Sequence, residues 1–316
     1  MKTLVTGGAG FIGSTLVDRL LDDGHHVEVI DNMSSGRLSN LKDAQDRHGA
    51  RLSLRDLDIR DSEIGGVITS YSPEVIFHLA AQIDVRRSVL DPIFDAEVNV
   101  IGSLNVLEGA RTAGTRKVVF ASSGGTIYGD VPHDLLPVDE SHPFQPVSPY
   151  GITKGVMADY FRAYERFHGL QTATCALANV FGPRQDPHGE AGVVAIFAKR
   201  LLSGEPCTIY GDGSATRDYI YVDDAVDAFI CAAEFGSGLY NIGTGVETST
   251  EDLYLVLAKA ASVDAQPDYA PERPGEIPRS ALNASRARRE LGWNPNVGVE
   301  DGARRVLDYF RTHFDY

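Results

Sequence analysis

A glycine-rich stretch close to the N-terminus constrains the fold more than any other feature of this chain. The run Gly7–Gly13 reads GGAGFIG and lies between a short apolar segment, Leu4–Thr6, and a helical pattern, Phe11–Leu21. Glycine permits a tight turn and a close approach of the backbone to a pyrophosphate, and a helix N-terminus offers unpaired N–H groups to phosphates. The stretch therefore predicts a dinucleotide site formed by Gly7, Gly10, Phe11, Ile12 and Gly13.

Short apolar segments alternate with longer amphipathic ones through the first half of the chain. Helical patterns such as Ala96–Thr112 lie between these segments. This alternation predicts an α/β fold of the Rossmann type, a doubly wound parallel sheet with helices on both faces. We expect its first strands at Leu4–Thr6, Val27–Ile30, Leu52–Leu54, Val75–Leu79 and Val118–Ala121.

The pattern of the sequence changes near residue 180, beyond which proline and glycine residues separate shorter segments. We therefore predict a dinucleotide-binding domain over residues 1–180 and a smaller mixed α/β substrate lobe over residues 181–316. Some segments of the second half, within 222–243, are expected to return to the first domain.

Composition excludes several classes of function. Asp and Glu number 44 against 29 Lys and Arg, a net charge of −15, which argues against nucleic-acid binding. The three cysteines form no C-x-x-C pair, which favours a reducing compartment over a disulfide scaffold or a zinc site. Asp186, His188 and Glu190 also lack zinc-type spacing, so we predict no metal. Without a long apolar run, the chain is expected to be soluble, cytoplasmic and free of membrane contact.

Asp31 ends the second predicted strand, 18 residues beyond Gly13. A carboxylate at this point can accept hydrogen bonds from the adenosine ribose and would repel a 2′-phosphate, so we predict NAD rather than NADP. The alternatives are that Asp31 only caps a turn, or that Arg37 favours NADP. Since ligands of such sheets lie beyond the carboxyl ends of the strands, we also expect cofactor contacts from Asn32, Asp58, Ile59, Leu79, Ala80 and Ala81.

A tyrosine and a lysine share one face of a predicted helix that runs from about residue 150 to His168. The run Ser148–Lys154 reads SPYGITK, so Tyr150 and Lys154 are four residues apart. A tyrosine hydroxyl has a pKa of about 10 and is a poor base at neutral pH, but a lysine charge and a positive nicotinamide ring would favour the phenolate. The pair predicts that Tyr150 takes a proton from a substrate hydroxyl as hydride leaves the same carbon.

Together these motifs resemble the extended short-chain dehydrogenase/reductase family and, within it, the UDP-glucose (UDP-galactose) 4-epimerases. The resemblance covers nearly the whole chain. Its segments are TGGAGFIG (6–13), DN (31–32), HLAAQ (78–82), NV (99–100), SSGGTIYGD (122–130), SPYGITK (148–154), ANVFGPRQDPHGEAGVVAIF (178–197), GDGSATRDYIYVDD (211–224), NIGTG (241–245) and RPGEIP (273–278).

The resemblance implies reversible C4 epimerisation of a UDP-hexose through a 4-keto sugar, with tightly bound NAD, in a homodimer formed by helices near 92–112 and 150–168. It implies that Tyr150 is the acid/base, that Lys154 also holds the nicotinamide ribose, and that Asn99 contacts the cofactor. It further implies that the UDP moiety is bound by Asn179, Val193, Arg217, Arg273 and Glu276. Arginine suits this task because its planar group pairs with phosphate oxygens.

The sequence departs from the family pattern at Gly124, where a Ser or Thr usually bonds the reacting hydroxyl. We favour Thr126 as the replacement, with Ser123 as the alternative. Related 4,6-dehydratases and UDP-glucuronate decarboxylases carry acidic residues in this stretch, where this chain has Gly125 and Thr126, which supports an epimerase.

A small residue, Ser280, follows Glu276 by four positions, where the family sets the room for the sugar's 2-substituent. N-acetylated hexosamines are therefore possible substrates. The alternatives are another NAD-dependent nucleotide-sugar enzyme, such as a UDP-glucuronate 4-epimerase or a dTDP-sugar epimerase or reductase, and a catalytically silent NAD-binding sensor.

Overall fold

The computed structural model describes residues 1–188, 192–273 and 277–313. Its strands are β1 (Lys2–Thr6), β2 (His26–Asp31), β3 (Leu52–Asp56), β4 (Val75–His78), β5 (Lys117–Ser123), β6 (Gln171–Leu177), β7 (Asn179–Phe181), β8 (Thr208–Tyr210), β9 (Thr216–Tyr221), β10 (Gly238–Ile242), β11 (Glu247–Ser249), β12 (Asp268–Ala270) and β13 (Arg279–Ser280). Its α-helices are α1 (Phe11–Asp22), α2 (Lys42–His48), α3 (Ile64–Tyr71), α4 (Val85–Leu90), α5 (Pro92–Ala96), α6 (Ser103–Ala113), α7 (Gly124–Ile127), α8 (Pro149–His168), α9 (Val193–Ser203), α10 (Val222–Phe235), α11 (Thr250–Ala261), α12 (Ser285–Leu291) and α13 (Val299–His313).

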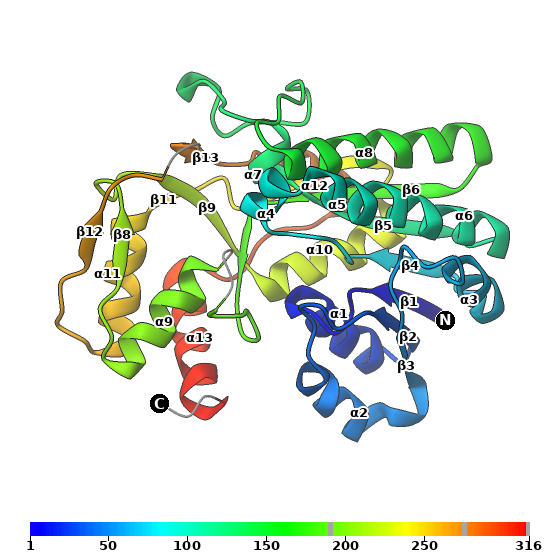
Figure 1. The fold of residues 1–316 in the computed structure, drawn as a ribbon, viewed down its shortest axis with the longest axis horizontal. Helices are drawn as coiled ribbons and strands as arrows, with labels where there is room; N and C mark the ends of the chain where they lie inside the picture. The colour runs from blue at the N-terminus through cyan, green and yellow to red at the C-terminus, as the bar shows by residue number, and fades with distance from the viewer. Residues whose placement is uncertain (189–191, 274–276, 314–316) are drawn as a thin grey trace.

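Seven parallel strands form the large sheet, in the order β10-β6-β5-β4-β1-β2-β3 (Figure 1). The predicted α/β fold with a doubly wound parallel sheet is confirmed. Strand order runs outward from β1 toward β3 on one side and from β4 toward β10 on the other. This change of direction leaves a crevice beyond the carboxyl ends of β1 and β4, where ligands of such sheets bind.

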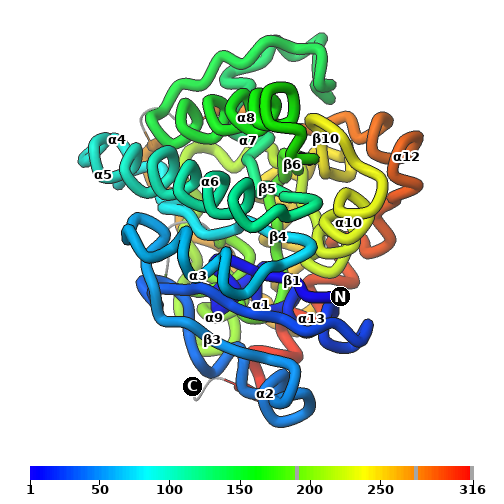
Figure 2. The backbone as a smooth tube through the Cα atoms, turned by 90° about the vertical axis from the view of Figure 1, so that its right-hand side faces the viewer, coloured from blue at the N-terminus to red at the C-terminus, as the bar shows by residue number. Residues whose placement is uncertain are grey.

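Helices cover both faces of this sheet, as the apolar periodicity of the sequence requires (Figure 2). On one face α3, α6 and α8 bury Ile68, Leu107 and Phe161 among the strands. On the other face α1 and α10 bury Leu16 and Phe229. Both faces of the central strands are therefore removed from water, which explains why those segments read as mainly apolar runs, whereas the edge strand β3 is largely exposed.

A smaller lobe lies beside the carboxyl ends of the sheet, on the left of Figure 1. Its central strand, β9, pairs with β7, β11 and β13, and a separate pair is formed by β8 and β12. The helices α9, α11 and α13 pack together around a core that contains Phe197, Leu257 and Phe310. Between these elements, α10 packs on α1 and β6, and β10 joins the large sheet through Gly238–Ile242.

The predicted single helix Ala96–Thr112 is wrong in its detail. In the structure α5 ends at Ala96, a π-helical segment spans Glu97–Gly102, and α6 begins at Ser103. The widened turn coincides with buried Asn99, whose main-chain oxygen accepts a 2.6 Å hydrogen bond from the Ser103 hydroxyl. Apolar spacing cannot distinguish such a segment from an α-helix, although π-helical turns often accompany functional sites.

None of the helices in the described part of the chain has the length and apolar character that crossing a bilayer requires.

Candidate cofactor and catalytic site

A cavity of about 410 Å³ lies at the carboxyl ends of the central strands, in the crevice that the strand order creates. This volume is within the range of small-molecule sites. The cavity brings together most of the residues predicted to bind the cofactor, and it extends to the tyrosine and lysine of α8. Its walls include Gly7, Gly10, Phe11, Ile12, Gly13, Asp31, Asn32, Asp58, Ile59, Leu79, Ala80, Ala81, Tyr150 and Lys154.

The glycine-rich loop is packed so tightly that side chains are excluded from it. Gly7 has a φ of +71°, and a Cβ there would lie 2.7 Å from the main-chain nitrogen of Ala80. A Cβ on Gly13 would collide with the main-chain oxygen of Gly7. Gly10 is the N-cap residue of α1 and has no side chain. The first N–H groups of the helix therefore receive no capping hydrogen bond from a side chain. This is the arrangement that an anionic pyrophosphate requires.

Asp31 joins the end of β2 to the glycine-rich loop. Its two carboxylate oxygens accept hydrogen bonds of 2.9 Å from the N–H groups of Ala9 and Met33. Burial raises the pKa of the Asp31 carboxyl, and these two N–H groups act in the opposite direction. The carboxylate thus lies in the cavity wall with its orientation fixed by the main chain.

Asn32 and Asp58 connect the neighbouring strand ends. The Asn32 amide donates a 2.8 Å hydrogen bond to Asp58, which also accepts hydrogen bonds from the guanidinium and main-chain N–H of Arg60. The contact with Arg60 lowers the pKa of the Asp58 carboxyl to about 2. The Asp58 carboxylate in the cavity wall is therefore ionised and partnered by Arg60.

Tyr150 and Lys154 also line the cavity and are both buried. The helix α8 that carries them begins with Pro149 after Ser148, whose hydroxyl accepts a 3.1 Å hydrogen bond from the N–H of Gly151. The Lys154 ammonium donates a 2.9 Å hydrogen bond to the Ala121 carbonyl and lies 5.7 Å from the centre of the Tyr150 ring.

Burial controls the protonation of both side chains. It raises the pKa of the Tyr150 hydroxyl to about 12, while a hydrogen bond with Ser123 acts in the opposite direction. It lowers the pKa of the Lys154 ammonium to about 8, while the charge of Asp95 acts in the opposite direction. The chain by itself therefore holds Tyr150 protonated at neutral pH, and ionisation of Tyr150 needs additional positive charge.

The stretch that departs from the family pattern lies next to Tyr150. Ser123 hydrogen-bonds the phenol, whereas the Thr126 hydroxyl donates a 3.3 Å hydrogen bond to the main-chain oxygen of Ser123. A Cβ on Gly124 would collide with Leu282, so this position faces the interior. Of the two candidate hydroxyls, Ser123 is thus the one that contacts the acid/base candidate.

Asn99 lies behind the cavity wall rather than in it, and its side chain is buried. Its amide group donates to Asp95, Thr153 and the main-chain oxygen of Gln82, and its oxygen accepts from the N–H of Gln82. Gln82 follows the cavity residues Leu79–Ala81, so Asn99 supports this segment. Direct contact of Asn99 with a cofactor stays a prediction.

Three of the residues predicted to bind the substrate gather on the small lobe's central sheet. Arg217 is opposite Ser280 in the pairing of β9 with β13, and Asn179 pairs with Tyr219 of the same strand. A Cβ on Gly125 would lie 3.7 Å from the side-chain oxygen of Asn179 and 3.9 Å from the hydroxyl of Ser280, so Gly125 faces this group.

Two other predicted substrate residues lie on different parts of the small lobe. Val193 is the first residue of α9, and the Arg273 guanidinium lies 3.6 Å from the centre of the Tyr210 ring. Glu276 and Glu190 lie outside the described residues.

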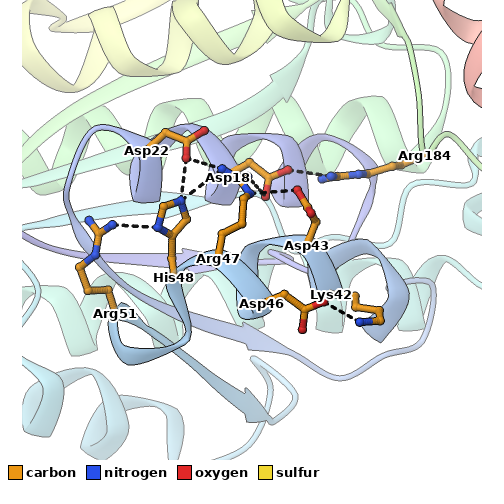
Figure 3. A network of polar contacts seen from close by, with 9 residues as sticks. All are labelled: Asp18, Asp22, Lys42, Asp43, Asp46, Arg47, His48, Arg51 and Arg184. Atoms are coloured by element: carbon orange, nitrogen blue, oxygen red, sulfur yellow. Dashed lines mark hydrogen bonds and ion pairs between the residues drawn. The ribbon is translucent and has the colours of Figure 1, made fainter.

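A segment that was not predicted to bind the cofactor also forms part of the cavity wall. Arg184, Gln185 and Asp186 follow β7 and line the cavity. Arg184 forms a 2.7 Å ion pair with Asp18 of α1, and Asp186 forms a 3.2 Å ion pair with Arg37. Figure 3 shows the first of these contacts reaching a cluster of charged side chains on α1 and α2. In the sequence, this part of the wall is indicated only by the segment GPRQDP, which is one of the segments that resemble the family.

The sequence matches the profile of the GDP-mannose 4,6-dehydratase family over residues 4–306. The chain belongs to this family. It is accordingly an extended short-chain dehydrogenase/reductase, which confirms the resemblance drawn from the motifs.

Relatives of this family match the chain along its entire length. A UDP-glucose 4-epimerase of Mycolicibacterium smegmatis is 50% identical over 314 residues, which cover 99% of each chain. The crystal structure of a UDP-glucose 4-epimerase from Thermotoga maritima with UDP-glucose has a TM-score of 0.94 at 43% identity, covering 99% of each chain. The structure of the Thermus thermophilus UDP-glucose 4-epimerase complex with NAD has a TM-score of 0.92 at 42% identity, covering 99% of this chain and 100% of that one.

Proposed function

We propose that this protein is an NAD-dependent UDP-glucose 4-epimerase, which interconverts UDP-galactose and UDP-glucose in galactose metabolism. One observation carries the proposal: the glycine-rich loop and the Tyr150–Lys154 pair line a single cavity. Relatives of 42–50% identity that match the whole chain are named UDP-glucose 4-epimerases, which supports the same substrate.

The residues present fit NAD. The tight loop at Gly7–Gly13 and the uncapped N-terminus of α1 suit a pyrophosphate, and the Asp31 carboxylate suits the adenosine ribose. The negative charge of the Asp31 carboxylate, which is bonded only to main-chain N–H groups, disfavours the extra phosphate of NADP. When bound, NAD supplies an acceptor for the hydride of the sugar's C4 and returns that hydride later.

The chain's own residues handle the proton. Tyr150, as phenolate, removes the proton of the sugar's 4-hydroxyl and returns it to the ketone oxygen when the hydride comes back. The Lys154 ammonium and the Ser123 hydroxyl stabilise the phenolate, and we now favour Ser123 over Thr126 as the hydroxyl that replaces the family's Ser or Thr. Epimerisation requires no further acid or base, only room for the 4-keto sugar to turn over.

Dehydration, the reaction for which the family profile is named, needs an acid and a base to eliminate water after the first oxidation. Gly125 faces the side chains of Asn179 and Ser280 and has no carboxylate, and the neighbouring Thr126 has none either. The absence of acidic side chains from this stretch supports epimerisation over dehydration.

The small lobe holds the UDP moiety in this proposal. Arg217 and Arg273 bind the diphosphate, and Asn179 and Val193 help to position the nucleotide. Glu276, which would bind the uridine ribose, stays a prediction from the resemblance. Since Ser280 is small and lies beside Gly125, the site also leaves room for an N-acetyl group at C2.

We also propose that the protein is a homodimer. Ile152, Val156 and Tyr160 recur every four residues along α8, and each is at least 38% exposed. Ile93 and Ile101, on the adjoining α5 and π-helical segment, are exposed as well. An apolar surface of this kind on two neighbouring helices supports packing against the same surface of a second copy. The three free cysteines support a cytoplasmic location.

The test uses purified protein without added cofactor. After incubation with UDP-galactose, proton NMR should resolve a mixture rich in UDP-glucose, which would demonstrate both the epimerase and the NAD that it retains. If nothing is converted, NAD is added once. Continued absence of conversion would refute the proposal and leave another nucleotide sugar or the silent sensor.

A further inference from the structure

A fully buried carboxylate, that of Asp95, lies beside the catalytic pair. Asp95 belongs to α5, and its side chain is 0% exposed. One carboxylate oxygen accepts hydrogen bonds of 2.8 Å from the Gln82 amide and 3.1 Å from the Asn99 amide. The other accepts a 2.9 Å hydrogen bond from the Thr153 hydroxyl. The three donors come from three different segments, so this one side chain ties those segments together.

Thr153 links this network to the reacting groups. It lies in α8 between Tyr150 and Lys154, and its hydroxyl is also 3.0 Å from the main-chain oxygen of Tyr150. Gln82 follows Leu79–Ala81 of the cavity wall, and its main-chain N–H and C=O both bond to the side chain of Asn99. Asp95 therefore braces the first turn of the catalytic helix against the cofactor segment.

The charge of Asp95 is compensated by neutral donors. Within the described residues, no Lys, Arg or His forms an ion pair with its carboxylate, and a buried charge of this kind acts over a longer range than an exposed one. The titratable groups around Lys154 are Tyr150 on the same helix, Asp95 on α5 and His78 on β4. Burial lowers the pKa of His78 to about 3, so His78 is neutral at working pH.

We propose that Asp95 is a positioning residue for the catalytic pair: its carboxylate fixes the turn between Tyr150 and Lys154 through Thr153, and it supplies a buried negative charge to this part of the site. The inference rests on the proposed function, because Asp95 acts on the proposed acid/base pair: its charge favours the Lys154 ammonium and opposes ionisation of Tyr150. It adds a group that lies outside the substrate and cofactor contacts.

Asp95→Asn tests the charge with little change of shape. An amide nitrogen in place of the oxygen that faces Thr153 can donate to the Thr153 hydroxyl, which in turn donates to the main-chain oxygen of Tyr150. Thr153→Val is the complementary variant. It keeps the Asp95 carboxylate but removes one of the hydrogen-bond donors that stabilise the negative charge of Asp95. Circular dichroism and NAD content, measured in the full chain as purified, check that each variant retains its fold and cofactor.

The readout is the titration of Lys154, followed by NMR in protein labelled with ¹³C at lysine Cε and assigned with Lys154→Met. The pKa of this ammonium is about 8 in the wild type. The Asp95→Asn variant should lower the midpoint by about one pH unit, and Thr153→Val should raise it. The pH profile of epimerase kcat should shift in the same two directions.

A purely structural role for Asp95 would change the melting temperature of both variants without opposite movements of the Lys154 midpoint, and this result would overturn the proposal. If Asp95→Asn does not fold, Thr153→Val decides alone, since an unchanged or lower midpoint would contradict the inference. The titration does not depend on turnover. A failure of UDP-galactose conversion would therefore remove the proposed function and leave the titration readable.

Discussion

The guanidinium of Arg184 lies 2.7 Å from the carboxylate of Asp18, and both side chains are only 18% exposed. The pair joins the segment after β7, which forms part of the cavity wall, to the middle of α1, whose N-terminus forms another part. Burial raises the pKa of the Asp18 carboxyl, and the charge of Arg184 opposes that effect. The ion pair therefore holds two walls of the cofactor site in contact.

Asp18→Asn should weaken the retention of NAD. The substitution leaves the Arg184 guanidinium largely buried without its counter-charge, which costs about 1–3 kcal/mol at this partial exposure. We expect NAD to dissociate about tenfold faster, equivalent to about 1.4 kcal/mol, as measured by the loss of bound cofactor during dialysis. Asp43→Asn is the control, because Asp43 pairs with Arg47 in the same cluster but is 69% exposed. Equal retention in both variants would contradict the prediction.

Tyr150→Phe should abolish conversion of UDP-galactose and leave NAD in place. The loss of the acid/base should reduce kcat by about 10²–10⁴-fold. Proton NMR of the sugar nucleotides measures turnover, and the NAD released on denaturation measures cofactor content. Tyr160→Phe, on the exposed side of the same helix, should behave as the wild type.

Ser123→Ala and Thr126→Val distinguish the two candidate hydroxyls. Ser123 contacts the Tyr150 phenol, so its removal should lower kcat by about 10²-fold or more. Thr126 donates its hydroxyl to a main-chain oxygen within its own turn, so its removal should change kcat less than threefold, which is about 0.7 kcal/mol. A larger loss from Thr126→Val than from Ser123→Ala would restore the interpretation drawn from the sequence.

Asp58→Asn should reduce the free energy of unfolding in a pH-dependent manner. The pKa of Asp58, about 2, lies below its ordinary value of 3.8, so the ionised carboxylate stabilises the folded state. This stabilisation is present above about pH 4 and is lost as the pH falls toward 2. Urea unfolding should give a deficit of about 1–2 kcal/mol at pH 7 and a smaller one at pH 3. Asp46→Asn, at an exposed carboxylate, should show little change at either pH.

Val156→Glu should dissociate the proposed homodimer. The substitution puts a charge into the apolar stripe of α8, where Ile152 and Tyr160 flank it. Light scattering should then report the mass of a single chain, while circular dichroism remains that of the folded protein. Leu255→Glu, an exposed apolar position on α11, is the control and should leave the mass of the dimer unchanged. A wild type that is itself monomeric would refute the proposed assembly.

The large sheet and the cofactor cavity are predictable because their signals are local. A parallel strand buried on both faces appears as an unbroken apolar run, as at Val75–Phe77, and the glycine-rich loop needs only neighbouring residues to specify its turn. The residues that follow each strand then meet at one edge of the sheet. That geometry brings Asp31, Asp58 and Ala80 together in one cavity, as the topology leads one to expect.

The remaining features depend on partners that are distant in the sequence. Nothing near Asp95 indicates that Thr153 of another helix will donate to it, and nothing near Arg184 indicates Asp18. The π-helical turn at Asn99 is likewise set by its bonds to Gln82 rather than by apolar spacing. Such side-chain pairings require the tertiary structure, because neither periodicity nor residue type specifies them.

The return of β10 to the large sheet has a consequence for how the chain matures on the ribosome. β6 pairs with β5 on one side and with β10 on the other, and β10 is synthesised only after β8 and β9 of the small lobe. Until Ile242 has emerged, the nascent sheet ends in β6 with its hydrogen-bonding edge open, and such an edge recruits other strands. The first lobe is therefore completed only by a segment that lies within the sequence of the second lobe, and a chain truncated before Gly238 should aggregate rather than fold as an independent nucleotide-binding unit.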